Sequence, residues 1–203
     1  IQIISERLNM SEQGVFLMRD HDFTLLSEAP YEKEEILQEL LAARPELIAG
    51  VTTLEGKPVD LLLVRREMGV AKNDGGSAIW SVDHLFIDTN GVPVLVEVKR
   101  STNTEIRRQV VGQLLEYASN AVSYWSVSEL RAAFESSGAQ LARTTQDNVQ
   151  DSPLAIDPDA FWALVESNLS AGRIRMVFVA DRLPAELIRI IEFLNSQMHP
   201  AEV

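Results

Sequence analysis

Apolar residues recur along this chain with two different spacings, which predict helices and strands in a definite order. Spacings of three and four residues place side chains on one face of a helix, and they occur over residues 31–44, 102–120, 127–136, 159–169 and 184–198. Short apolar runs that predict strands occupy residues 58–66, 78–88, 92–99 and 174–180. A separate short hairpin is predicted over residues 14–26, and polar irregular stretches at 72–77 and 138–158 predict loops.

This order predicts an α/β fold with a mixed central sheet flanked by helices. The elements follow one another as a helix, strands, a helix, an insertion, a strand and a final helix. We divide the chain into an N-terminal hairpin extension, residues 1–30, and one domain, residues 31–203, with a helical and loop insertion over about residues 126–171. The sequence begins at Ile1 without an initiator Met, so we expect a fragment of a longer protein that has a further C-terminal domain.

Composition excludes several classes of protein. Hydrophobic residues make up 46% of the 203 residues, which suits a packed core and argues against disorder. Cysteine is absent, so disulfides and thiolate metal sites are excluded. No apolar run is long enough for a membrane span and no signal peptide is evident, so we expect a cytoplasmic protein with no membrane partner. A homo-oligomer is compatible with this composition.

The formal net charge of -12 argues against a strong autonomous binder of duplex DNA, because affinity for DNA comes largely from neutralising phosphates. It does not exclude a nuclease, since a metal site gathers acidic residues. A local basic patch can still guide DNA to such a site, and Lys99, Arg100, Arg107 and Arg108 form one in the sequence. The two arginines at 107 and 108 fit surface charge pairing equally well.

Charged residues interrupt two apolar strands that a short turn joins. Asp83 lies in the first strand, and Glu97-Val98-Lys99 ends the second. Glu97 and Lys99 are two residues apart and leave the same face of the strand, so the hairpin can bring them to Asp83. Two carboxylates and an amine suit a divalent-metal phosphodiesterase site that holds Mg²⁺ or Mn²⁺. The backbone carbonyl of Val98 is a further candidate ligand.

The helix predicted after these strands adds a second signal. Gln113 and Tyr117 are four residues apart and therefore share a helical face. Gln113 can bind a site carboxylate or a phosphate, and Tyr117 can do the same or stack on a base.

Together, Asp83, Glu97-Val98-Lys99 and the Gln113-x-x-x-Tyr117 step resemble the PD-(D/E)XK, or restriction-endonuclease-like, nuclease superfamily, and the last step resembles its RecB-type branch. The resemblance covers about residues 31–122 by motif, and Val82 stands where the superfamily's nominal Pro would be. It implies a restriction-endonuclease-like core and a metal-dependent nuclease domain that acts on DNA. The chain also resembles a group of uncharacterised bacterial proteins with a nuclease-like N-terminal domain.

The resemblance also implies that a glutamate of the first helix completes the metal site, and Glu34 or Glu35 could fill that place. If the apolar residues of that helix form its buried face, Glu34 lies near the edge of the face and Glu35 nearly opposite. We therefore prefer Glu34. The buried residues expected on this argument are Ile36, Leu37, Leu40 and Leu41.

Other residues are assigned structural roles. We expect Asp88 to cap the turn between the two strands and His84 to pack rather than to bind a ligand. The tryptophans are expected in the core: Trp80, Trp125 and Trp162. The alternative to a nuclease is a catalytically inactive nuclease-like fold that binds nucleic acid or a protein, which the acidic net charge favours.

Overall fold

The computed structural model describes residues 15–19, 22–27, 31–49, 60–71, 78–101, 109–137 and 157–203. The chain divides into two compact units, residues 1–31 and residues 32–203. The smaller unit contains an antiparallel hairpin of β1 (Val15–Arg19) and β2 (Asp22–Leu26), which confirms the hairpin predicted there. Met18 and Phe23 are opposite each other in this hairpin, and both are exposed.

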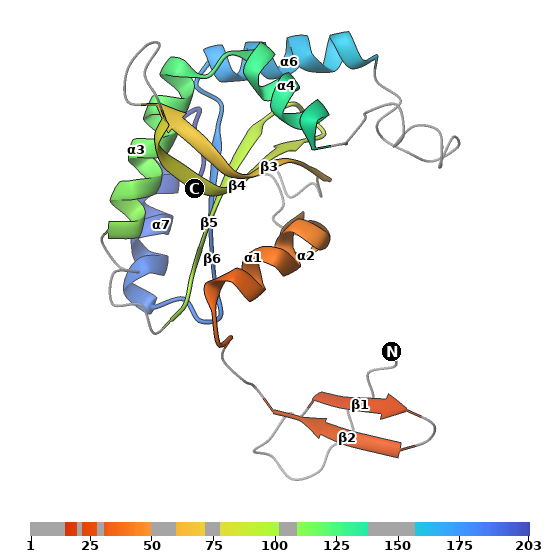
Figure 1. Ribbon diagram of the computed structural model, residues 1–203. Helices are drawn as coiled ribbons and strands as arrows, with labels where there is room; N and C mark the ends of the chain where they lie inside the picture. Colours follow the sequence, from red (N-terminus) through yellow and green to blue (C-terminus); the bar gives the residue numbers. More distant parts are fainter. Residues whose placement is uncertain are drawn as a thin grey trace. The chain divides into compact units, whose positions relative to one another are not determined.

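The larger unit is a mixed α/β structure around a four-stranded sheet in the order β3-β4-β5-β6 (Figure 1). The strands are β3 (Leu61–Ala71), β4 (Ala78–Asp88), β5 (Pro93–Lys99) and β6 (Arg175–Ala180). The first three pair antiparallel, and β6 pairs parallel to β5. This confirms the predicted α/β class with a mixed sheet flanked by helices.

The described helices of this unit are α1 (Glu34–Ala43), α2 (Glu46–Ala49), α3 (Gln109–Tyr124), α4 (Val127–Ser136), α6 (Pro158–Ser170) and α7 (Ala185–Gln197). Local signals explain where two of them begin. Ser126 and Glu129 form a capping box at the start of α4, and Asp157 caps α6, in which Pro158 is the first residue. No helix in the described ranges is long and apolar enough to cross a membrane.

Several boundaries differ from the sequence prediction. β3 continues to Ala71, beyond the predicted end at residue 66. Buried and more exposed side chains alternate in its last part, where Met68 and Val70 are buried, so this part lacks the continuous apolar run on which the prediction rested. α3 continues to Tyr124 rather than residue 120. The predicted loop at 72–77, the start of the predicted helix at 102–108 and most of the predicted loop at 138–158 lie outside the described residues.

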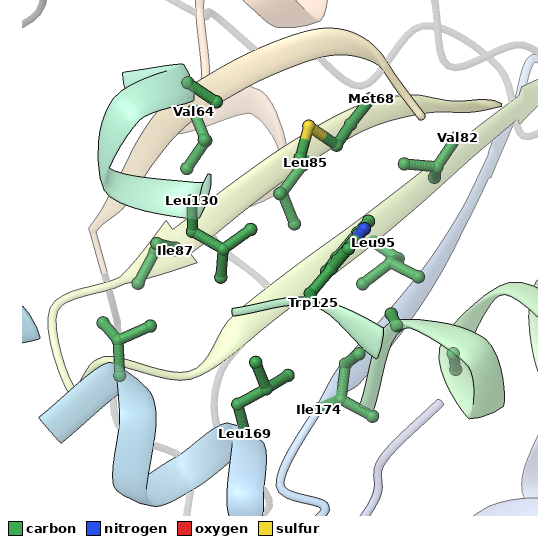
Figure 2. Packing of buried hydrophobic residues seen from close by; sticks show 14 of the residues in the cluster. Val64, Met68, Val82, Leu85, Ile87, Leu95, Trp125, Leu130, Leu169 and Ile174 are labelled. Atoms are coloured by element: carbon green, nitrogen blue, oxygen red, sulfur yellow. The ribbon is translucent and has the colours of Figure 1, made fainter. Parts of the chain in front are cut away.

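One face of the sheet packs against α3, α4 and α6 and forms the main core (Figure 2). Leu85 and Leu95 from the sheet and Leu114 and Leu130 from the helices are fully buried in it. Trp125 also lies here, and its indole Nε1 donates to the Gly69 carbonyl at 3.0 Å. Trp162 is buried too, so the packing role predicted for these two tryptophans is confirmed, whereas the Trp80 side chain lies outside the described part.

On the opposite face of the sheet, α1 packs against β4 and β5. His84 and Phe86 alternate along β4 with the core residues Leu85 and Ile87, so they point to this other face. The His84 ring contacts the backbone of α1, and α1 lies on the side of the sheet away from α3 (Figure 1). β4 and β5 therefore lie between α1 on one face of the sheet and the helices of the main core on the other.

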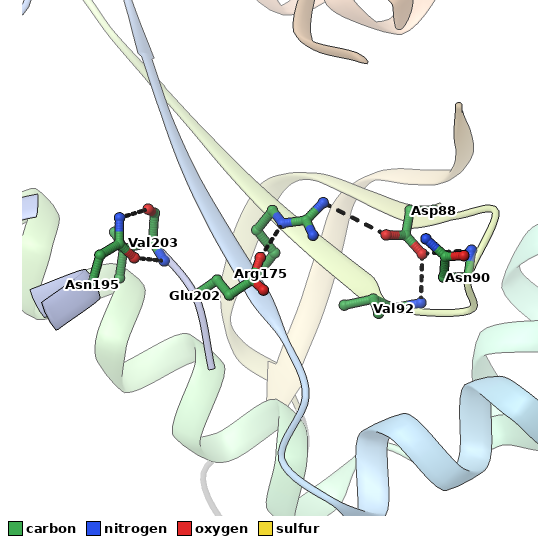
Figure 3. Close-up of polar contacts among 7 residues, drawn as sticks. All are labelled: Asp88, Asn90, Val92, Arg175, Asn195, Glu202 and Val203. Carbon is green, nitrogen blue, oxygen red and sulfur yellow. Dashed lines mark hydrogen bonds and ion pairs between the residues drawn. The ribbon is translucent and has the colours of Figure 1, made fainter. Parts of the chain in front are cut away.

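A buried charge cluster closes the end of the sheet opposite to Lys99 (Figure 3). Asp88 Oδ1 accepts the N–H groups of Asn90 and Val92 at 2.9 and 2.8 Å, which confirms the turn-capping role predicted for Asp88. Its other oxygen lies 3.5 Å from the Arg175 guanidinium, which also donates to Glu202 at 2.8 Å. Arg175 lies between the two carboxylates and offsets part of their negative charge, so the buried Asp88 carboxylate has a counter-charge.

The C-terminal residues of the chain run beside the start of β6. Glu202 donates its N–H to the Ile174 carbonyl at 3.0 Å and accepts the Met176 N–H at 2.9 Å. The side-chain amide of Asn195 bonds both the N–H and the carbonyl of Val203 (Figure 3). These bonds supply partners for backbone groups at the outer edge of the sheet.

Candidate functional site

The strands β4 and β5 separate toward the Lys99 end of the sheet, and the separation creates the candidate site. Their paired register runs from Ile87 with Pro93 to His84 with Val96. Beyond that pair, β4 continues beside β3 only, and β5 continues beside β6 only. We call the point of separation the β4–β5 fork and define it by Asp83, Glu97 and Val98.

Asp83 spans the fork with its side chain. Its Oδ2 accepts the N–H of Val98 at 2.8 Å, in the place where the ladder between the two strands has ended. The Asp83 carboxylate thus gives the Val98 N–H, which faces β4, the hydrogen bond that a backbone carbonyl of β4 would otherwise provide. The bond holds Asp83 against β5, on which Glu97 and Lys99 lie.

Glu97 is the most enclosed carboxylate of the site, with 2% of its surface exposed. Its Oε1 accepts from Lys99 Nζ at 2.8 Å and from Gln113 Nε2 at 3.0 Å. Gln113 Nε2 also donates to the Tyr117 hydroxyl at 2.7 Å. Glu97 Oε2 is buried and has no hydrogen-bond partner among the described residues. Most buried polar atoms in proteins are paired, so this oxygen can accept a bond from a water or a bound ligand.

The first helix brings Glu34 to the same place. Its Oε1 accepts the Arg100 N–H at 2.9 Å, and its Oε2 lies 4.0 Å from Lys99 Nζ. Glu34 is three residues before Leu37 and seven before Leu41, so it lies on the buried face of α1. Glu35 is exposed.

The prediction of that buried face was wrong in part. Ile36 and Leu40 are 44% and 37% exposed, and only Leu37 and Leu41 are buried. Four apolar residues in adjacent pairs cover a wide arc of the helix, and the sheet contacts only one half of it. Glu34 points toward the sheet because it lies on the same side of the helix as Leu37 and Leu41. The prediction instead placed it at the edge of a wider face that included Ile36 and Leu40.

Burial and mutual repulsion shift the ionisation of these groups. Burial, followed by the negative charge of Asp83, raises the pKa of Glu97 to about 7, although Lys99 opposes the shift. Burial also raises the pKa of Asp83, against the opposing effect of the Val98 hydrogen bond. For Lys99, burial acts to lower the pKa, but the bond to Glu97 and the nearby carboxylates outweigh it and raise the pKa. Lys99 is therefore protonated at neutral pH.

The chemistry of this donor set fits a hard divalent cation. Every available donor is oxygen, and Mg²⁺ is commonly held by one or two carboxylates while it keeps several waters. Asp83 and Glu97 supply such a pair, and the unpartnered Glu97 Oε2 offers a free acceptor. In the part of the chain that the structure describes, no three His, Cys, Asp or Glu side chains converge closely enough to enclose a metal by themselves. Water would have to complete the coordination.

The remaining predicted residues are Arg100, the two arginines at 107 and 108, and His84. Arg100 follows the site directly, and its Nε is buried without a hydrogen-bond partner among the residues that the structure describes. Arg107 and Arg108 lie outside the described residues. His84 is fully buried and stacks on Phe86 with ring centroids 5.7 Å apart, which confirms packing as its immediate environment.

Sequence reasoning missed two residues that support the site. The Gln38 side chain lies beside the Asp83 carboxylate and acts to lower its pKa, and a signal existed because Gln38 is four residues after Glu34 and shares its helical face. Asp181 accepts both the N–H and the hydroxyl of Ser101, at 2.6 and 3.0 Å, and so joins the chain after β5 to the chain after β6. Only the parallel pairing of these strands brings Ser101 and Asp181 together, and no local pattern shows it.

Comparisons with protein-family models, with curated proteins and with solved structures gave no match. The residues of the β4–β5 fork and their neighbours are therefore the basis for a functional assignment.

Proposed function

We propose that the larger unit is a restriction-endonuclease-like domain that hydrolyses phosphodiester bonds in DNA with Mg²⁺ or Mn²⁺. The observation that carries the proposal is Glu97 Oε2, a buried carboxylate oxygen with no hydrogen-bond partner in the described part of the chain, on a side chain beside Asp83 and Lys99. An unpaired buried acceptor is costly, and a divalent cation would supply the missing partner. The resemblance of Asp83, Glu97, Lys99, Gln113 and Tyr117 to the nuclease motifs supports the same assignment.

The roles of the residues follow from their positions. Asp83 and Glu97 would hold the metal together with waters and the Val98 carbonyl, and Glu34 would join the site through one of those waters. A bound metal of this kind polarises a phosphoryl oxygen and lowers the pKa of a bound water. Lys99, which is protonated and 2.8 Å from Glu97, orients the attacking water and offsets negative charge as it develops.

Substrate contacts are assigned to the rim of the site. Gln113 donates to both Glu97 and the Tyr117 hydroxyl, and these two residues of α3 would position the substrate beside the metal. Arg100 has a buried Nε that no described residue pairs with, and its guanidinium is suited to a phosphate. Arg107 and Arg108 extend the basic stretch in the sequence and are proposed as further phosphate contacts.

Cleavage assays on single-stranded, duplex and branched DNA test this proposal, each with Mg²⁺, with Mn²⁺ and with chelator. We expect metal-dependent cleavage by the wild type and its loss in Glu97→Ala and Lys99→Ala. Glu35→Ala and Glu116→Ala are matched controls, because both glutamates are exposed on the helices that carry site residues, and they should cleave as the wild type does. Cleavage that survives in both site variants would remove the catalytic assignment.

A second candidate is a catalytically inactive nuclease-like module that binds nucleic acid or a protein. It is favoured by the Lys99 amine, which already occupies Glu97 Oε1 at 2.8 Å and can neutralise the site without a metal. Calorimetric titration with Mn²⁺ separates the two candidates. Binding that Asp83→Ala abolishes supports the metal site, and a wild type that does not bind Mn²⁺ supports the inactive module.

A further inference from the structure

His84 is buried completely, directly after Asp83, and its side chain points to the α1 side of the sheet. Its Nε2 lies 2.8 Å from the Gln38 carbonyl oxygen. A carbonyl oxygen only accepts, so Nε2 carries the proton in this contact. Nδ1 is then a buried acceptor, and within the described ranges it has no hydrogen-bond partner. Burial lowers the pKa of His84, which favours the neutral ring.

Space filling alone does not account for a histidine here. The ring stacks on Phe86 at an interplanar angle of 19°, and a hydrocarbon ring would stack equally well without an unpaired buried nitrogen. The feature that only the histidine provides is the donor aimed at Gln38. That bond connects β4 to α1 at the level of the site.

The His84 bond gives α1 a defined position. Leu37 and Leu41 bury the inner face of α1, but apolar contacts are not directional and permit small shifts along the sheet. A hydrogen bond has a narrow range of length and angle. Gln38, which receives this bond on its carbonyl, also has its side chain beside the Asp83 carboxylate, where it acts to lower the pKa of Asp83. Glu34 lies one turn earlier and reaches the Arg100 N–H.

We propose that His84 is a positioning residue that, through the Gln38 carbonyl, fixes α1 so that Gln38 orients Asp83 and Glu34 reaches the β4–β5 fork. The inference rests on the proposed function, because the carboxylates that it orients are the proposed metal ligands. It assigns to His84 no contact with metal or substrate. Its consequence is that metal affinity depends on a residue of the opposite sheet face.

Calorimetric titration of the intact chain with Mn²⁺ tests the inference. His84→Phe keeps a stacking ring and removes the donor, and we expect the Kd for Mn²⁺ to rise at least tenfold. His84→Gln places an amide nitrogen close to the position of Nε2, and we expect it to bind within threefold of the wild type. His84→Asn is the second donor-deficient variant, because its shorter amide does not reach Gln38, and it replaces His84→Phe if that variant does not fold.

Phe86→Leu is the matched control for lost packing, since it weakens the stack under the ring and leaves the donor in place. We expect it to lower the midpoint of urea unfolding without weakening Mn²⁺ binding. A wild type that binds Mn²⁺ while His84→Phe or His84→Asn binds it equally well would overturn the positioning role alone. A wild type that does not bind Mn²⁺ would overturn the proposed function and, with it, this inference.

Discussion

Glu97→Gln should make the stability of this protein less dependent on pH. In the folded chain the pKa of Glu97 is raised from an ordinary value of 4.5 to about 7, chiefly by burial and by the charge of Asp83. Below about pH 4 the carboxyl is protonated in both the folded and the unfolded chain. Between about pH 4.5 and 7 the unfolded chain releases the proton more readily, so the wild type loses stability as the pH rises.

The size of the effect follows from the same shift. Ionisation of Glu97 in the folded state costs about 3 kcal/mol more than in the unfolded chain, at about 1.4 kcal/mol for each tenfold change in the equilibrium. Glutamine keeps an acceptor for Lys99 and Gln113 but does not ionise. The free energy of unfolding of the wild type, relative to Glu97→Gln, should therefore fall by about 3 kcal/mol between pH 4 and pH 8.

Urea unfolding at half-unit pH steps measures this difference. Glu35→Gln is the matched control, because Glu35 is exposed and its replacement should leave the pH profile of the wild type unchanged. Mn²⁺ at a hundred times its Kd should restore about 2.7 kcal/mol to the wild type at pH 8 and not to the variant. Parallel pH profiles for the wild type and Glu97→Gln would refute the reasoning about this buried carboxylate.

The other predictions concern the metal, the lysine and two parts of the core. Mn²⁺ should bind more tightly at pH 8 than at pH 6 in calorimetry, because Glu97 must lose its proton before it can act as a ligand; equal affinity at both would contradict its raised pKa. Lys99→Ala should lower the cleavage rate by about a hundredfold or more while Mn²⁺ still binds, and Lys99→Arg should not restore the rate, since a guanidinium is no substitute for a compact amine. Leu114→Ala should cost about 2–5 kcal/mol in urea unfolding because its side chain is fully buried. Arg175→Ala should cost about 3–5 kcal/mol in the same assay, since it leaves Asp88 buried without its counter-charge, and a cost below about 1 kcal/mol would show that the pair contributes little.

The sheet was predictable because its strands are strongly apolar and bounded by turn residues. The segments 78–88 and 92–99 form β4 and β5 almost as expected. The extension of β3 to Ala71 was not predicted, because polar residues after Val64 end the apolar run from which the strand was recognised. The buried face of α1 was misassigned because periodicity alone cannot tell which half of a wide apolar arc meets the sheet.

The candidate site was predictable in its strand residues and in the neighbouring Gln113 and Glu34, and not in the strand geometry that joins them. Glu97 and Lys99 share a strand face by simple alternation, and their ion pair at 2.8 Å agrees with that. The β4–β5 fork was not predictable, because a hairpin pattern suggests continuous pairing, whereas the ladder ends at His84 and Val96. The contact of His84 with Gln38 joins residues far apart in the chain and needs the packed structure.

Diffraction from crystals of the chain soaked in Mn²⁺, recorded for anomalous scattering, tests the metal site most directly. The account predicts an anomalous peak at the β4–β5 fork, bonded to Glu97 Oε2 and to an oxygen of Asp83, and the absence of that peak in Glu97→Gln crystals. A soaked crystal with no anomalous peak at the fork, or with manganese bound only elsewhere on the chain, would contradict it.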